Sequence, residues 1–220
     1  MSKSRPTPTP KPRLIARDWL EAALEALSEG GIAAVSIERI AAKLGITRGS
    51  FYHHFRDRAD LLERTLAYWR EGWTRSVIDE SNALGIDART TLLALARTIR
   101  GRRAAEYDVA IRAWAVHDPV AAAVVRRVDE ERLGHLRRLF AKMGFDELEA
   151  ENRSRLFLYY EMGEPAMFAR QSKSLEERLI VERHRYLTAG SAAADGADRS
   201  GNSRRPAQAA SRQSTRGTVN

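Results

Sequence analysis

The chain has 220 residues, of which 43% are hydrophobic and 30% are charged, so it can bury the core of one medium domain or two small ones. It contains no cysteine, which excludes disulfides and thiol catalysis. No apolar run approaches the roughly 18 residues that span a bilayer, and the N-terminus lacks the apolar segment of a signal peptide. We therefore expect a cytoplasmic protein that makes no membrane contact.

The net charge of +8 lies mainly at the two ends of the chain. Residues 1–13 contribute four positive charges, and residues 190–220 combine five arginines with two aspartates. The overall basicity is therefore weak evidence for nucleic-acid binding, because solvated tails explain it equally well. We expect residues 1–12 to be a disordered, proline-rich basic arm that can lie along DNA, and residues 190–220 to be a disordered tail.

The first helix is expected over about residues 13–29, where Trp19, Ala23 and Leu27 share one apolar stripe and two glycines follow. Residues 36–55 then read as two short helices joined by a tight turn. Ser36 can cap the first of these helices, and Gly45 can end it in the left-handed conformation.

The second short helix is expected to begin after Thr47 as its cap, with Phe51 and Phe55 turned to the core. Its opposite face carries hydrogen-bonding and cationic side chains: Thr47, Arg48, Ser50, Tyr52, His53 and His54. A short helix with an apolar back and such a front suits the major groove of DNA.

A long helix should follow from the cap Asp57, with apolar residues at helical spacing through Val77, and would link the N-terminal part to the rest mechanically. Further helices are expected over about 88–100 and 106–116, from Asp118-Pro119 to Met143-Gly144, from Asp146 onward, and from a capping box at Ser174 to about Thr188. Gly163-Glu164-Pro165 should kink a helix that otherwise continues to Gln171. No strand pattern is present, so the fold class is all-α.

The stretch Ser-Ile-x-x-Ile-Ala-x-x-Leu-Gly-Ile-Thr-Arg-Gly-Ser-Phe-Tyr-His-His-Phe-x-Asp-Arg-x-Asp-Leu-Leu resembles the helix-turn-helix of TetR-family transcriptional regulators. The resemblance covers residues 14–70, and the remainder is similar mainly in layout. It implies an N-terminal three-helix helix-turn-helix domain over 13–70 and a C-terminal helical effector-binding and dimerisation domain over 71–189. It also implies a homodimer, joined through its last two helices, that binds double-stranded DNA at a palindromic operator. Such a protein is typically a ligand-responsive repressor, here with an unknown small-molecule effector.

By this resemblance, the residues that face base edges or the groove are Thr47, Arg48, Gly49, Ser50 and His53. Those that hold phosphates are Ser36, Tyr52, His54 and Arg58. Gly49 allows the backbone to approach DNA closely, and Arg48 can either read guanine in bidentate fashion or bind a phosphate. The family usually has lysine where this chain has Arg58, so the positive charge is kept.

Several aromatic side chains of the C-terminal part are candidates for an effector pocket by the same resemblance: Trp69, Trp73, Tyr107, Trp114, Phe157 and Tyr160. Plain helical core is the alternative for most of them, although buried Tyr and Trp need polar partners. Polar ends of a pocket could come from Glu106, Asp108, Arg112 and His117.

Other classes of function have less support. The adjacent His53 and His54 diverge by about 100° on a helix, and the remaining histidines have no ligand spacing, so neither a metal site nor a cofactor is expected. An aromatic pocket with His and Glu could do acid–base chemistry, but no nucleophile–base pair or carboxylate pair supports an enzyme. A non-specific nucleoid protein that binds through its basic tails would lose binding when residues 1–12 and 190–220 are deleted.

Overall fold

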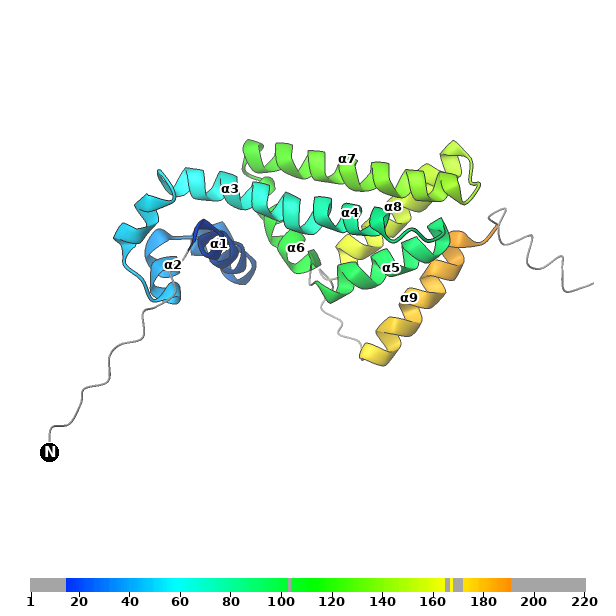
Figure 1. Cartoon of the computed structure of the whole chain (residues 1–220), viewed down its shortest axis with the longest axis horizontal. Coiled ribbons are helices and arrows are strands. Elements are labelled where there is room, and N and C mark those ends of the chain that lie inside the picture. Colours follow the sequence, from blue (N-terminus) through cyan, green and yellow to red (C-terminus); the bar gives the residue numbers. More distant parts are fainter. Residues whose placement is uncertain (1–14, 103, 165–166, 168–171, 191–220) are drawn as a thin grey trace, which may run out of the picture.

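The computed structural model describes residues 15–102, 104–164, 167 and 172–190, and every regular element within these ranges is a helix (Figure 1). The all-α class predicted from the sequence is confirmed. The predicted N-terminal arm and nearly all of the predicted C-terminal tail lie outside the described residues. The N-terminal helices sit at one end of an elongated molecule, and the remaining helices form a larger bundle beside them.

The N-terminal end comprises α1 (Ala16–Gly30), the 3₁₀ turn η1 (Ile32–Ala34), α2 (Ile37–Leu44), η2 (Arg48–His53) and α3 (Arg58–Arg70). The predicted ends of α2 are confirmed, because the Ser36 hydroxyl accepts a hydrogen bond from the Arg39 amide and Gly45 closes the helix at φ 68°. Asp57 caps α3 by accepting from the amide of Asp60.

The second short helix differs from the prediction. It is the 3₁₀ helix η2, and the Thr47 side chain makes no capping hydrogen bond to it. Phe51 still turns to the core as predicted, where its ring meets Trp19 edge-on at 5.2 Å and stacks on Phe55 at 5.3 Å. The tighter helix therefore keeps its buried anchor while its exposed side chains turn outward.

The helix that begins at α3 continues through a π-helical segment, η3 (Glu71–Arg75), into α4 (Ser76–Ala83). Figure 1 shows the three as one rod that leaves the N-terminal end and runs along the larger bundle. The long linking helix expected from the sequence is thus present, but the π segment inside it was not expected. Its looser turns leave carbonyls that accept side-chain donors, from Arg102 at Gly72 (3.4 Å) and from Arg132 at Trp73 (3.3 Å).

The larger bundle adds α5 (Ala88–Gly101), α6 (Ala104–Ala115), α7 (Pro119–Lys142), α8 (Glu147–Gly163) and α9 (Lys173–Thr188). Asp118 and Asp146 cap α7 and α8 as predicted. The cap of α9 is Ser172 rather than the predicted Ser174, which lies in the first turn. Helix α8 ends at Gly163, and Glu164 follows it with helical dihedrals in a 3₁₀ turn. Pro165 and most of the predicted continuation to Gln171 lie outside the described residues, so the kink stays a prediction.

Two hydrophobic cores hold these helices together. The first core is built around Trp19, Phe51, Leu61 and Trp69, and it also takes in Ile111 from α6 and Val128 from α7. The second core lies between α4, α5, α7, α8 and α9. Because the first core draws on α6 and α7, the N-terminal helices pack directly on the bundle as well as joining it through α3.

Candidate functional site

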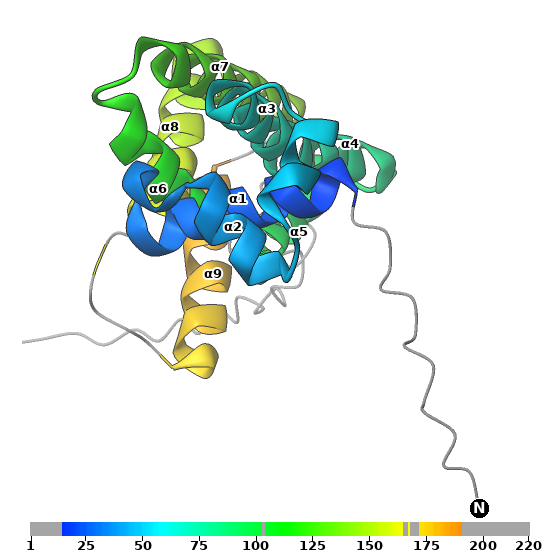
Figure 2. The ribbon, with the colours of Figure 1, turned by 90° about the vertical axis from the view of Figure 1, so that its left-hand side faces the viewer.

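The outer face of η2 forms the first candidate site, which we call the reading surface and define as Thr47, Arg48, Gly49, Ser50, Tyr52 and His53. All six are exposed except the half-buried Ser50, and Tyr52 leaves 53% of its surface in solvent. Figure 2 views the molecule from this end, with α1 and α2 toward the viewer. The structure therefore brings these predicted residues to one outward face, backed by the buried Phe51.

Polar contacts already order part of the reading surface. The Arg48 guanidinium forms an ion pair with Glu38 of α2 at 3.2 Å and donates to the Tyr52 hydroxyl at 3.4 Å. Tyr52 and Glu38 raise the pKa of Arg48, so this side chain stays a cation. A Cβ added at Gly49 would meet only the Thr47 hydroxyl, at 3.7 Å, so packing within the protein does not require a glycine there.

Three predicted phosphate ligands are placed beside this face. Ser36 and His54 are half-buried at the N-terminus of α2 and the end of η2. Arg58 has a role that was not predicted, because its Nε donates to the Val35 carbonyl and its Nη2 to the Ile32 carbonyl, each at 2.7 Å. These bonds hold the loop before α2 against α3. They commit two of the donors that a phosphate would need.

The second candidate site is a cavity between η3, α4, α5, α6, α7 and α8, with a free volume of about 50 Å³. Its wall is mostly apolar, and its polar members are Thr74, Asp108, Arg132, His135 and Glu161. Asp108, His135 and Glu161 are each at most 3% exposed. A water molecule needs about 10–15 Å³ of such volume, so the cavity has room for a few water-sized groups.

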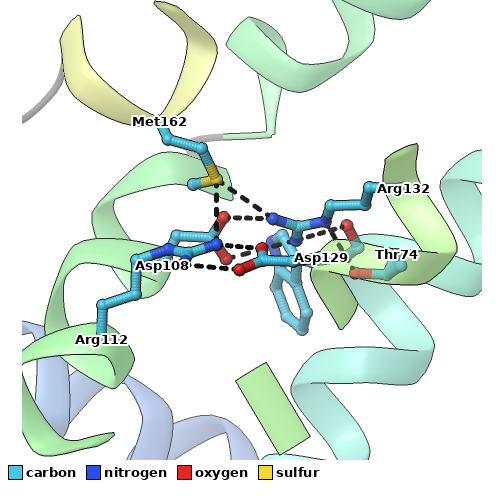
Figure 3. A network of polar contacts seen from close by, with 7 residues as sticks. Thr74, Asp108, Arg112, Asp129, Arg132 and Met162 are labelled. Atoms are coloured by element: carbon cyan, nitrogen blue, oxygen red, sulfur yellow. Dashed lines mark hydrogen bonds and ion pairs between the residues drawn. The ribbon is translucent and has the colours of Figure 1, made fainter. Parts of the chain in front are cut away.

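An ion-pair network closes one side of the cavity (Figure 3). The Arg132 guanidinium pairs with Asp108 of α6 through both ends, and its Nε donates to the Thr74 hydroxyl at 3.1 Å. Arg112 pairs in the same way with Asp129, and both arginines reach the Met162 sulfur at 3.4 Å. The network thus joins the π segment, α6, α7 and α8 at the cavity wall.

The six aromatic residues predicted for a pocket are not gathered around this cavity. Only Trp73 and Phe157 line it. Trp69 is fully buried in the first core, and Tyr107 packs edge-on against Trp73 from outside the wall. Trp114 lines a separate groove between α1 and α6, and the Tyr160 ring carries the Arg183 guanidinium at 3.5 Å.

The residues predicted to supply the polar ends of an effector pocket are also divided between two sites. Asp108 lines the cavity, and Arg112 lies behind it, whereas Glu106 and His117 line the groove between α1 and α6. Sequence reasoning missed the cavity residues Arg132, His135 and Glu161. Arg132 and Asp108 lie 24 positions apart in the chain, so no local pattern pairs them.

Burial governs the titration of the cavity residues. It lowers the pKa of His135 to about 4, helped by the positive charges of Arg138 and Lys142, so the imidazole is neutral at pH 7. Burial raises the pKa of Glu161, against the opposing effect of Arg100 (3.2 Å) and Arg183 (2.9 Å). Among the described residues, no cluster of three or more His, Asp or Glu side chains is arranged to hold a metal ion.

The fold and the reading surface define an all-helical protein with an N-terminal helix-turn-helix. Residues 20–65 match the family model of bacterial regulatory proteins of the tetR family, a range that includes α2, η2 and most of α3. This N-terminal part of the chain is thus similar to the DNA-binding region of the TetR family of transcriptional regulators. The proteins it matches are regulators and not enzymes.

Two curated relatives are similar to the N-terminal part. The transcriptional regulator BetI of Yersinia pestis is 36% identical over 78 residues, which is 35% of this chain and 39% of the relative. The transcriptional regulator AcuR of Cereibacter sphaeroides is 32% identical over 85 residues, which is 37% of this chain and 39% of the relative. The chain thus matches about two-fifths of the length of each relative, and this similarity carries no information about the cavity.

Solved structures extend the likeness to the whole fold. GusR of Salmonella enterica superposes with a TM-score of 0.61 at 18% identity, covering 79% of this chain and 93% of that protein. A TetR/AcrR-family regulator from Thermobifida fusca gives 0.58 at 16% identity, covering 80% and 97%. In the described part of this chain, no helix is long and apolar enough to cross a membrane.

Proposed function

We propose that the chain is a ligand-responsive transcriptional regulator, a repressor that binds a palindromic DNA operator as a homodimer in the cytoplasm, at the nucleoid. The observation that carries the proposal is the reading surface: an exposed face of hydrogen-bonding and cationic groups on a helix anchored by Phe51. Helix-turn-helix proteins place such a helix in the major groove. The proposed division is a DNA-binding domain over 13–70 and an effector and dimerisation domain over 71–189.

Operator selection tests the DNA-binding part. Duplexes selected from a random library by the full chain should contain two inverted half-sites, because a twofold dimer meets successive major grooves. Tyr52→Ala should weaken binding to the selected duplex by at least tenfold in fluorescence anisotropy, with the circular dichroism spectrum unchanged. Ser28→Ala, a small substitution on α1 away from η2, is the matched control. Unaltered affinity in Tyr52→Ala would remove that residue from the interface.

Deleting the two basic tails distinguishes a sequence-specific regulator from a protein that binds DNA non-specifically through those tails. A variant lacking residues 1–12 and 190–220 should keep its preference for the selected duplex over scrambled DNA, with a smaller salt dependence. If that variant loses all binding while the full chain shows no sequence preference, binding through the basic tails would be the better account.

The dimer proposal is supported by apolar side chains that α8 and α9 leave in solvent. On α8 these are Leu148, Leu156 and Tyr159, at 79%, 53% and 57% exposure, and on α9 they are Leu175, Val181 and Tyr186. Soluble proteins rarely leave large apolar patches uncovered unless a partner buries them. Two copies of α8 and α9 packed about a twofold axis would cover them as a four-helix bundle.

Sedimentation velocity tests this interface. We expect a dimer at micromolar concentration, and Leu156→Asp should dissociate it because an unpaired carboxylate would be buried in the seam. Val116→Asp is the matched control, since Val116 is 74% exposed after α6 and away from α8 and α9. A monomeric wild-type protein, or a dimer that survives Leu156→Asp, would place the interface elsewhere.

Effector control is proposed to act through the rod of α3, η3 and α4. The cavity wall includes Trp73 and Thr74 of the π segment, and Arg132 contacts both of them while pairing with Asp108. A ligand that alters this network would shift the segment from which α3 leads to the reading surface. It can act only through different affinities for the DNA-bound and DNA-free arrangements.

A further inference from the structure

The chemistry of the cavity wall restricts what can bind there. The carboxylates and guanidinium of the wall already have partners within the protein: Asp108 pairs with Arg132, and Glu161 pairs with Arg100 and Arg183. A charged ligand would bring an additional charge into a buried site without a counter-charge, which is costly. Apart from Thr74 and His135, the rest of the wall is apolar, with Trp73, Leu95 and Phe157 among its members.

Two buried polar atoms of the wall residues make no hydrogen bond among the described residues: Glu161 Oε2, which still has the Arg100 guanidinium at 3.2 Å, and one nitrogen of His135. The His135 ring is 2% exposed, and its Nε2 lies 3.1 Å from the Ser81 hydroxyl, a residue outside the cavity wall. Its Nδ1 is buried and has no hydrogen-bond partner among the described residues. A buried polar atom without a partner costs free energy, so a ligand that supplies one gains affinity.

We infer that the cavity takes a small uncharged ligand, mainly apolar and no larger than one ring, with one hydroxyl or carbonyl group that pairs with His135 Nδ1. This inference rests on the proposed role of the cavity as the effector site and names the chemical class of the effector. The ring nitrogen can serve either kind of group. If the Ser81 hydroxyl donates to Nε2, then Nδ1 carries the proton and donates, and if Nε2 donates to Ser81, then Nδ1 accepts.

The size class follows from the free volume and from one flexible wall residue. The volume of about 50 Å³ holds a few water-sized groups as it stands, whereas a cavity that binds benzene has roughly 150 Å³. Met162 lies across the ends of Arg112 and Arg132, and a methionine adapts its shape more readily than the branched or aromatic side chains around it. A ligand with one ring would therefore enter by displacing Met162 before it disturbed the ion pairs.

Four probes of similar size separate the chemical classes: phenol, toluene, benzoate and benzylammonium, titrated into the full chain at pH 7.5 by isothermal calorimetry. Phenol and toluene have nearly the same shape and differ in one hydrogen-bonding group. We expect phenol to bind about three- to tenfold more tightly than toluene. Both charged probes should bind at least tenfold more weakly than phenol. Tighter binding of either charged probe, or no detectable binding of phenol and toluene, would overturn the inference.

Two substitutions at the same position separate the two ring nitrogens. His135→Gln places an amide near the position of Nε2 and removes the group at Nδ1, so phenol should lose its advantage over toluene. His135→Asn places an amide near the position of Nδ1, so the advantage should remain. His184→Leu is a control outside the cavity, where the ring nitrogen contacts the Arg89 carbonyl. A phenol advantage that survives His135→Gln at full size would refute the role of Nδ1.

A measurement on the wild-type protein avoids dependence on the variants folding. Nitrogen-15 spectra of histidine-labelled protein distinguish the two ring nitrogens, and phenol should shift Nδ1 of His135 while leaving His184 unchanged. An unshifted Nδ1 at saturating phenol would also refute the assignment. Operator binding is measured separately. Phenol that binds as expected without altering DNA affinity would leave the ligand class intact and contradict only the proposed regulatory role of the cavity.

Discussion

The two cores of this protein differ in the side chains that fill them. In the first core, behind the reading surface, aromatic rings pack together, and the ring centroids of Trp19, Phe51 and Phe55 lie within 6.5 Å of one another. The second core surrounds a cavity and lies beside buried ion pairs, including Asp108 at 1% and Glu161 at 3% exposure. Close apolar packing favours one rigid arrangement, whereas a cavity with paired charges leaves room for a second one. The part that must match DNA is filled, and the part proposed to respond to a ligand is not.

The largest expected effect is at the buried ion pair. Asp108→Asn keeps the shape of the side chain but leaves Arg132 without its counter-charge, so we expect a loss of about 3–5 kcal/mol in unfolding free energy by urea denaturation. The matched control is Asp129→Asn, whose pair with Arg112 is about one-third exposed on both sides and should contribute about 1 kcal/mol or less. Equal losses in the two variants would show that burial does not distinguish these pairs.

Replacing both partners extends the same comparison. Asp108→Leu combined with Arg132→Met would make this side of the cavity apolar, like the first core. We expect it to recover most of the stability lost in Asp108→Asn, because apolar residues of similar volume often replace a buried pair without loss. The double variant should also respond less to any effector in DNA-binding assays, since Arg132 no longer holds Trp73 and Thr74.

The titration of His135 makes the stability of the fold depend on pH. Its pKa is about 4 in the folded chain and about 6.5 when unfolded, so the unfolded chain binds more protons between these values and stability falls as the pH is lowered. The loss of stability begins as the pH falls through about 6.5 and should reach on the order of 3 kcal/mol near pH 4.

The measurement compares wild type with His135→Gln in urea at pH 7 and pH 4. The pH-dependent change in unfolding free energy of the variant is subtracted from that of the wild type. This subtraction cancels the contributions of the neighbouring charged groups, which are Glu161, Asp108 and Arg132 in the wall and Arg138 and Lys142 on α7. Glu161 has a raised pKa and so contributes with the opposite sign. Parallel losses in the two proteins would mean that His135 titrates normally.

Arg58 offers a smaller test at the first core. Arg58→Met removes two donors from the Val35 and Ile32 carbonyls, and we expect a loss of about 1–2 kcal/mol in thermal or urea unfolding. Arg56→Met is the control, since Arg56 lies on the exposed turn two residues earlier, and Asp60, at 3.6 Å, is the only ion-pair partner of its guanidinium within the described part of the chain. The salt dependence of DNA binding tests the original prediction separately: a slope reduced by about one unit would show that Arg58 also contacts a phosphate.

The smallest effect is expected at the ion pair on the reading surface. Glu38 holds Arg48 in the free protein, and an exposed ion pair of this kind contributes little to stability. Glu38→Gln should leave the unfolding free energy unchanged and strengthen operator binding about two- to fivefold, because Arg48 no longer has to leave a carboxylate partner in order to bind DNA. Weaker binding in this variant would show that Glu38 positions Arg48 for DNA instead of competing for it.

The two parts also differ in how far the sequence could predict them. The caps Ser36 and Asp57 and the end at Gly45 are local signals, each acting within a few residues, and all three are confirmed. The 3₁₀ form of η2 was missed because its side-chain pattern over six residues fits either helix type. The role of Arg58 was missed because its partners lie 23 and 26 residues earlier.

In the bundle, helices and most caps were predicted, but the cavity was not. The aromatic composition favoured six residues as members of an effector pocket. In the folded chain five of them lie in the first core, a groove or the cavity wall, and Tyr160 packs against Arg183. The residues that give the cavity its character are an arginine, a histidine and a glutamate that meet only once the helices are packed. Asp108 was named as a possible polar end, while its partner Arg132 carried no signal of its own.

The π segment also constrains how this protein can exchange parts with its relatives. Each residue in an α-helix turns the chain by about 100°, so one inserted or deleted residue between α3 and α4 would rotate every later side chain of the rod by that amount. Val77 and Ile78, which line the cavity from α4, would then be replaced there by neighbours that now face elsewhere. A hybrid that joins a foreign helix-turn-helix to this bundle must therefore keep the number of residues through Glu71–Arg75, the Trp73 and Thr74 side chains of the cavity wall, and the carbonyls that accept from Arg102 and Arg132.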